Sequence, residues 1–138
     1  MSTKRIRDLS LVLGVVLLVG LAVAVTALTD RSPVREMVLV ADEMVFSVPG
    51  DPTPNPTLTA VTGERIRLVL DNRDRGVVHD LAVPDPAFRM ERLEADPGTR
   101  TAVEIRVPDR PGRYRYLCTY HSRMMTGILV VTPGSPSR

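Results

Sequence analysis

The chain has 138 residues, of which 43% are hydrophobic and 25% are charged, and its formal net charge is +2. The basic cluster that precedes residue 9 accounts for that excess, because residues 30–138 hold 15 Arg against 15 Asp or Glu. A neutral domain with interspersed charges argues against nucleic-acid binding, and the single cysteine excludes both an internal disulfide and a dinuclear metal centre bridged by two thiolates.

A 20-residue apolar run, residues 9–28, follows Lys4, Arg5 and Arg7. About 20 apolar residues span a bilayer as a helix, and basic residues before the run keep the N-terminus in the cytoplasm. We therefore expect residues 1–29 to form a single-pass anchor in a bacterial cell membrane, with the rest of the chain on the extracytoplasmic side.

The alternative is a cleaved signal peptide, because Ala22-Val23-Ala24 and Val25-Thr26-Ala27 offer small residues near the end of the run. The domain would then be secreted or periplasmic. Both interpretations place it outside the cytoplasm.

After a linker over residues 30–36, one domain is expected over residues 37–132, and residues 133–138 are expected to be a disordered tail. Strands are predicted at 37–48 (one or two), 64–72, 77–83, 101–107, 114–118 and 128–132, from alternating or continuous apolar residues. The proline-rich stretch 49–56 predicts a surface loop, and residues 88–95 predict a short helix. Short, closely spaced strands indicate an all-β, antiparallel sandwich.

The only cysteine and the only two histidines fall in two short segments. His79 lies in Val78-His79-Asp80-Leu81, while Cys118 and His121 lie in a segment that also contains methionines. Two imidazoles, one thiolate and one thioether are the ligand set of a blue-copper site. Zinc can use the imidazoles and the thiolate, but a thioether is a poor zinc ligand and favours one copper ion.

The spacing of the second segment carries a family resemblance. The motif is Cys118-x2-His121-x3-Met125-x-Gly127, preceded by Pro111-Gly112-x-Tyr114-x-Tyr116. It resembles the C-terminal ligand loop of the cupredoxins, the plastocyanin, azurin and amicyanin group, and the similarity runs over residues 38–131. The resemblance implies a Greek-key β-sandwich that holds copper at one end.

Two methionines compete for the axial position. Met124 gives the Cys-x2-His-x2-Met spacing of amicyanin-like loops, whereas Met125 gives His-x3-Met-x-Gly, which is similar to the azurin loop. The family usually places x-Gly after the axial methionine. We therefore expect Met125 to be axial and Met124 to be the alternative.

Four further residues are candidates for supporting the site. Asp80 is expected to help lock the loop that joins the two ligand segments, although many relatives have Asn or Ser at this place. Asn72, at the end of its strand, is a candidate tether, and Thr119 is a candidate for contacts that tune the sulfur. Tyr120 is expected to pack at the rim.

These residues predict a protein that carries single electrons between redox partner proteins outside the cytoplasmic membrane, and not an enzyme. No hydrolytic triad is expected, because both histidines are assigned to the metal, and an axial methionine fills the position that a substrate would need. The alternatives are a copper carrier that delivers its metal for the assembly of a membrane oxidase, and a sandwich domain that only supports such assembly.

Overall fold

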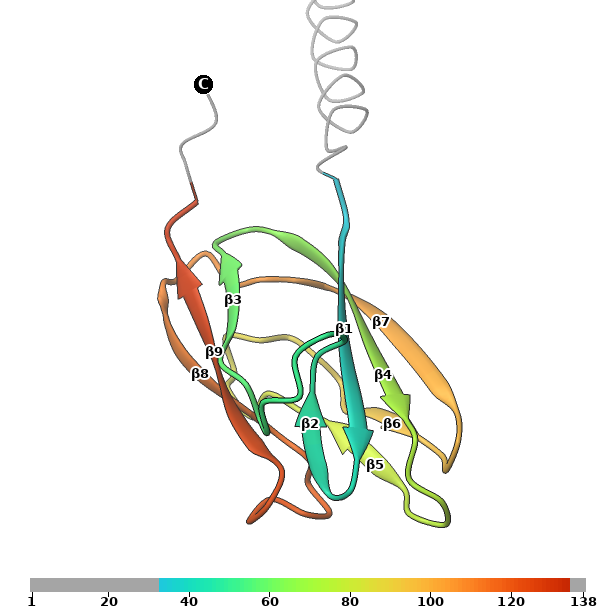
Figure 1. Ribbon diagram of the computed structural model, residues 1–138. Helices are drawn as coiled ribbons and strands as arrows, with labels where there is room; N and C mark the ends of the chain where they lie inside the picture. The colour runs from blue at the N-terminus through green and yellow to red at the C-terminus, as the bar shows by residue number, and fades with distance from the viewer. Residues whose placement is uncertain (1–32, 135–138) are drawn as a thin grey trace, which may run out of the picture. The chain divides into compact units, whose positions relative to one another are not determined.

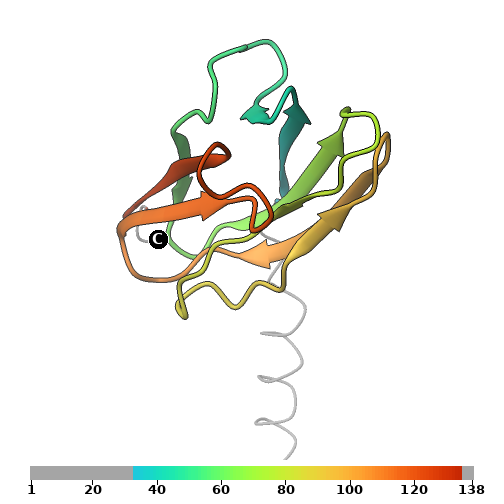
Figure 2. The ribbon, with the colours of Figure 1, turned by 90° about the horizontal axis from the view of Figure 1, so that it is seen from below.

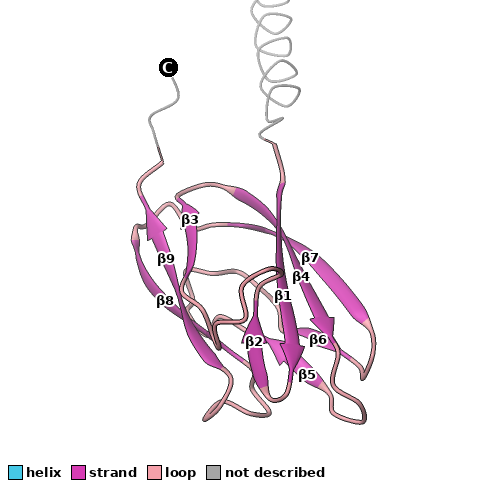
Figure 3. Ribbon diagram, in the orientation of Figure 1, coloured by secondary structure: helices cyan, strands magenta, loops and turns pink. Residues whose placement is uncertain are grey.

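The structure, a computed structural model, describes residues 33–134, and this part of the chain consists of nine strands and loops (Figure 3). The strands are β1 (Arg35–Asp42), β2 (Val45–Ser47), β3 (Leu58–Val61), β4 (Arg65–Asn72), β5 (His79–Leu81), β6 (Leu93–Ala95), β7 (Arg100–Arg106), β8 (Gly112–Leu117) and β9 (Thr126–Thr132). The all-β prediction is thus confirmed for the described residues.

The helix predicted over residues 88–95 is wrong. Phe88 is buried after a turn, and Leu93–Ala95 forms β6, which pairs with β5. Leu93 and Ala95 are buried while Glu94 between them is exposed, which is the period of a strand and not of a helix. Strands β3 and β6 were not predicted, because three or four residues are too few for a periodic pattern to stand out.

The strands form two sheets that face each other (Figures 1 and 2). One has the order β2-β1-β4-β7 and the other the order β3-β9-β8. The pair β5-β6 connects to β8 through two hydrogen bonds between Ala82 and Leu117, with N···O distances of 2.9 and 3.0 Å. This bridge joins the segment that carries His79 to the strand that ends before Cys118.

The sheets are mixed and not wholly antiparallel as predicted. Strand β1 pairs in parallel with β4, and β3 pairs in parallel with β9. The chain leaves the first sheet after β2, forms β3 in the second sheet and returns to the first as β4. A strand that is reached through such a crossover can lie parallel to its neighbour, whereas a tight hairpin always gives an antiparallel pair.

The core lies between the sheets and follows the alternation of the strands. In β4, Ile66, Leu68 and Leu70 are buried while Arg67 is exposed, although Val69 is buried as well. Each fully buried side chain of this size contributes roughly 1.5–3 kcal/mol of transfer free energy. The inward face of β4 therefore fixes the register of the sheet.

Tyr116 and Gly127 are opposite each other where β8 pairs with β9, and the tyrosine ring packs directly over the glycine. The Tyr116 ring is 1% exposed, and its hydroxyl donates a hydrogen bond to the Pro56 carbonyl at 2.6 Å. A Cβ atom at Gly127 would lie 2.2 Å from the ring, far inside contact distance. Position 127 therefore requires glycine, because the Tyr116 ring occupies the space that a side chain would need.

Three connections gather at one end of the sandwich, the lower end in Figure 1: the β1–β2 turn, the β4–β5 loop and the β8–β9 loop. Strand β1 begins and β9 ends at the opposite end (Figure 1). The residues predicted to bind metal are on or beside the gathered connections.

The predicted anchor over residues 1–29 and the last four residues of the predicted tail lie outside the described residues. Residues 33–134 contain no helix that is long and apolar enough to span a membrane.

Candidate metal centre

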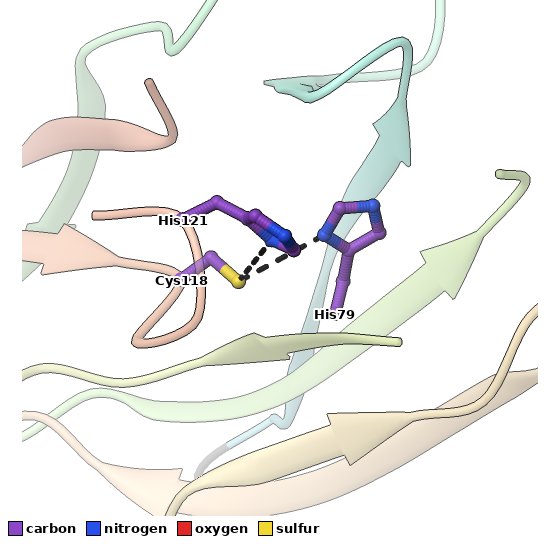
Figure 4. Close-up of side chains that lie close together, drawn as sticks. All are labelled: His79, Cys118 and His121. Carbon is purple, nitrogen blue, oxygen red and sulfur yellow. Dashed lines mark hydrogen bonds between the residues drawn. The ribbon is translucent and has the colours of Figure 1, made fainter. Parts of the chain in front are cut away.

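The three strongest predicted ligands come together at the end of the sandwich (Figure 4). His79 begins β5, Cys118 directly follows β8, and His121 lies in the β8–β9 loop. The Cys118 Sγ atom is 3.8 Å from Nδ1 of His79 and 3.5 Å from Nδ1 of His121. One ligand atom from each residue lies within 4.8 Å of the others.

These separations fit a metal ion. Bonds from a first-row metal to imidazole nitrogen and thiolate sulfur are about 2.0–2.3 Å long, so two such ligands at the corners of a trigonal site lie about 3.5–4 Å apart. The imidazole rings meet edge to face, with centroids 5.0 Å apart and planes at 62°. Both rings therefore direct a nitrogen at the sulfur without stacking on each other.

The centre is closed on its inner side and open at one ligand. His79 and Cys118 are 0% exposed, whereas His121 is partly exposed. The histidine on the strand therefore lies further in than the histidine on the loop.

The environment of Cys118 favours the neutral thiol unless a cation is present. Burial raises the pKa of the Cys118 thiol, and it outweighs the backbone N–H groups of Asp80 and His121, which lower the pKa. The Asp80 N–H donates to Sγ at 3.5 Å. A metal ion would supply the positive charge that the buried thiolate lacks.

Backbone hydrogen bonds hold the loop between Cys118 and Met125 in a compact turn. The His121 carbonyl accepts from the N–H groups of Met124 and Met125, both at 2.9 Å, and the Cys118 N–H donates to the Met125 carbonyl at 3.0 Å. The two ends of the loop are therefore adjacent, and Cys118, His121 and Met125 are brought to one place.

The two methionines have opposite environments. Met125 is 0% exposed and belongs to the core, whereas Met124 is 51% exposed. Of the two, only Met125 thus shares the buried cluster that contains Cys118. Its burial favours the expected axial assignment over Met124.

Asp80, expected to lock the loop between the two ligand segments, links the segments directly. Its side chain is fully buried, and its carboxylate accepts hydrogen bonds from the Thr119 N–H, at 2.5 Å, and from the Thr119 hydroxyl. Thr119 therefore contacts the carboxylate and not the sulfur. Arg92 on the surface adds an ion pair to Asp80, with an Nε···Oδ2 distance of 3.4 Å.

Asn72 is the predicted tether. It is 1% exposed, and its Nδ2 donates to the carbonyls of Val77 and Ala95 at 2.8 and 2.9 Å. Its Oδ1 accepts the N–H of Asp74 at 3.1 Å. Asn72 therefore shapes the β4–β5 loop, from which the chain enters His79.

Tyr120 is at the rim, as expected. It is 49% exposed, its hydroxyl donates to Glu94 at 2.5 Å, and Arg92 lies over its ring at 5.1 Å from the centroid. Its ring centroid is 6.3 Å from that of His121. These contacts fix the surface beside the exposed ligand candidate.

The sequence did not point to three residues that support the site: Asn55, Asp74 and Arg92. Asn55 Nδ2 donates to the Met124 carbonyl at 2.7 Å and so ties the proline-rich loop to the ligand loop. Asp74 accepts from His79 at 2.7 Å. Asn55 is 69 residues from Met124, so only the packing of the fold brings those two together, whereas Asp74 is five residues before His79 and its contact is local.

Comparison with known proteins places the chain among copper proteins. Residues 15–131 match the family model described as Cupredoxin-like domain. No curated protein matches the sequence.

Several solved structures share the fold. A copper nitrite reductase from Nitrosomonas europaea aligns with a TM-score of 0.60 and 19% identity over 75% of this chain, which spans 43% of that protein's chain. Auracyanin A, a blue copper protein from Chloroflexus aurantiacus, aligns with a TM-score of 0.56 and 15% identity over 72% of this chain and 100% of its own. A chain in a heme-copper terminal oxidase dimer aligns with a TM-score of 0.54 and 18% identity, over 91% of this chain and 99% of its own.

The family match and the arrangement of two histidines, one cysteine and one buried methionine together indicate one type 1 copper ion as the cofactor. Cysteine sulfur and imidazole nitrogen with a weak thioether is the donor set that copper prefers among first-row metals.

Proposed function

This chain belongs to the family of cupredoxin-like domains, and from that premise we propose that it is a mononuclear blue-copper protein that carries single electrons. One observation carries the proposal: the only cysteine of the chain and both of its histidines meet within 4.8 Å at one end of the sandwich. Unrelated structural roles for these three residues would not bring them together.

We propose that His79, Cys118 and His121 hold the copper strongly and that Met125 is a weak axial ligand. Copper in such a set accepts and releases one electron, because thiolate and thioether suit Cu(I) and imidazole suits Cu(II). The chain's own contribution is rigidity. The hydrogen bonds of the ligand loop and the clamp between Asp80 and Thr119 hold the donor atoms in place whether or not the charge of the site changes.

The proposed route for electrons is the exposed side of His121. Tyr120 and Met124, 49% and 51% exposed, are among the few exposed large hydrophobic side chains of the described residues, and both neighbour His121 in the loop. A small apolar surface around a redox ligand suits brief docking of a redox partner protein, because weak electron-transfer complexes bury little area. As the proposed axial ligand, the buried Met125 fills the coordination position that a substrate would need, which supports a carrier and not an enzyme.

The test is the absorption spectrum of the purified full chain with Cu(II). Thiolate-to-copper charge transfer should make it intensely blue, and Cys118→Ser should abolish the colour while Ser122→Ala, in the same loop, should keep it. A colourless wild-type complex would defeat the proposal.

We further propose that residues 9–28 anchor the chain in a bacterial cell membrane with the copper domain on the extracytoplasmic side. Support comes from the three basic residues before the apolar run. Protease added to intact spheroplasts should digest the domain. A domain protected from protease would reverse the orientation.

A second candidate function is copper delivery for the assembly of a membrane oxidase. This candidate is motivated by the alignment with nearly the full length of a chain in a heme-copper terminal oxidase dimer. That likeness shows the fold alone. An electron carrier should retain its copper through repeated reduction and oxidation in the presence of a metal-free acceptor. Loss of copper to the acceptor on reduction would favour delivery.

A further inference from the structure

The buried histidine has a carboxylate partner on the side away from the sulfur. Asp74, in the β4–β5 loop, has its Oδ2 atom 2.7 Å from Nε2 of His79. The His79 side chain is 0% exposed and that of Asp74 is 16% exposed. The contact is therefore almost entirely sheltered from water. A charge-assisted hydrogen bond is strong in such a low-dielectric environment.

Two backbone amides hold the same carboxylate in place. The N–H groups of Glu43 and Met44 donate to Asp74 at 2.9 and 3.3 Å. Both residues have positive φ angles, 50° and 64°, which is the backbone of a tight hairpin turn. The β1–β2 turn thus presents two hydrogen-bond donors to one carboxylate, and these bonds hold Asp74 in its position beside His79.

The neighbouring arginine does not take the Asp74 carboxylate away from the histidine. Arg73, its neighbour in the chain, pairs with Asp71 instead, at 3.0 Å. Asp74 is thus an anion that is directed at the histidine.

A carboxylate accepts hydrogen bonds and cannot donate them, so Nε2 of His79 must carry the proton. In a neutral imidazole the other nitrogen, Nδ1, then has a free lone pair. Nδ1 is the atom that faces Cys118 Sγ, at 3.8 Å. The partner of one ring nitrogen therefore decides what the other can bind.

We propose that Asp74 is a positioning residue of the copper centre: it fixes the tautomer and orientation of His79 and, through its negative charge, makes Nδ1 a stronger donor that favours Cu(II) over Cu(I). Histidine ligands commonly gain basicity from such a partner. A nearby negative charge also stabilises the more positive oxidation state. The inference rests on the proposed function, in which His79 is a copper ligand.

The test is Asp74→Asn in the full chain, beside Asp42→Asn as the matched control. Asp42 is an exposed residue that ends β1 at the same hairpin turn, so its substitution removes the same charge without touching His79. Asp74→Asn should remain blue, its reduction potential should be more positive than that of the control, and its affinity for Cu(II) should fall about 10–100-fold. Asn has only one acceptor oxygen, so it cannot serve both the His79 Nε2–H and the Glu43 N–H, which is why the effect should exceed that of charge alone. The reduction potential of Asp74→Glu should lie between that of Asp74→Asn and that of the wild-type chain.

A blue Asp74→Asn variant with the potential and affinity of Asp42→Asn would overturn the inference and leave the proposed function intact. A colourless wild-type chain would instead overturn the proposed function, and this inference with it. A measurement on the wild-type chain guards against a variant that does not fold. Nitrogen-15 NMR of the metal-free chain should show His79 protonated at Nε2 and unprotonated at Nδ1, and the opposite tautomer would refute the role of Asp74.

Discussion

Thr119 donates both its backbone N–H and its hydroxyl to the carboxylate of Asp80, with a backbone N···Oδ1 distance of 2.5 Å. Asp80 directly follows His79, and Thr119 directly follows Cys118. The residues after two proposed ligands are therefore bonded to each other. This clamp joins the two ligand segments with no metal involved, so the donor atoms are held close before copper arrives.

The clamp should contribute measurably to stability. Asp80→Ala would leave the Thr119 N–H and hydroxyl without their acceptor, and hydrogen bonds to a charged group are worth about 1.5–3 kcal/mol. We expect a loss of that size in the free energy of unfolding of the metal-free chain, measured with urea. Asp80→Asn should lose less, because its oxygen can still accept the Thr119 N–H.

Asp42→Ala, at an exposed site, is the control for the loss of an acidic side chain. If Asp80→Ala loses no more stability than this control, the clamp has no energetic role.

The axial assignment can be tested by a pair of leucine variants. Met125→Leu should shift the reduction potential and keep the charge-transfer band, because an axial thioether bond to copper is long and weak. Met124→Leu should change little, because its side chain is 51% exposed. Cyclic voltammetry and absorption spectra of the two variants provide the comparison. A larger shift for Met124→Leu would reverse the assignment.

Gly127 should not tolerate a side chain. A Cβ atom there would lie 2.2 Å from the Tyr116 ring, which is buried and hydrogen-bonded to Pro56. We expect Gly127→Ala to lower the free energy of unfolding by about 1–3 kcal/mol, as overpacking in a core does.

Gly112→Ala is the matched control for this steric effect, because its Cβ would meet the Tyr114 ring at 3.4 Å, the edge of ordinary contact. Thermal unfolding of both variants gives the comparison. Equal losses would show that the close approach of Tyr116 is not what requires Gly127.

Electron exchange should depend on the surface around His121. Ser122 is exposed beside it, so Ser122→Glu adds a bulky charge at the proposed docking surface without removing a ligand. We expect slower electron transfer to the redox partner in stopped-flow experiments and an unchanged absorption spectrum. Ala102→Glu, on an exposed position of β7, should leave the rate unaltered. If neither variant changes the rate, electrons leave through another surface.

Much of the fold could be predicted because the alternation of buried and exposed residues along a strand is visible in its own sequence. Alternation along residues 64–72 and 101–107 placed β4 and β7 to within a residue or two. The same logic failed for β3 and β6, which are too short to show a period, and for the mixed pairing of the sheets. Pairing depends on which sheet the chain enters next, and no local pattern contains that choice.

The sequence by itself determined which donor atoms the site can offer, because the chain contains one cysteine and two histidines and the spacing from Cys118 to Gly127 confines three donors to one short loop. Only the tertiary structure decided that Met125 faces inward, with 0% of it exposed, while Met124 faces solvent. Adjacent residues in a loop carry no period from which burial can be inferred. Likewise, only the packing of the β1–β2 turn against the β4–β5 loop supplies the Glu43 N–H that holds the Asp74 carboxylate in place. That contact depends on how two distant strands pair, and such long-range geometry is set by the whole core rather than by its neighbours in the chain.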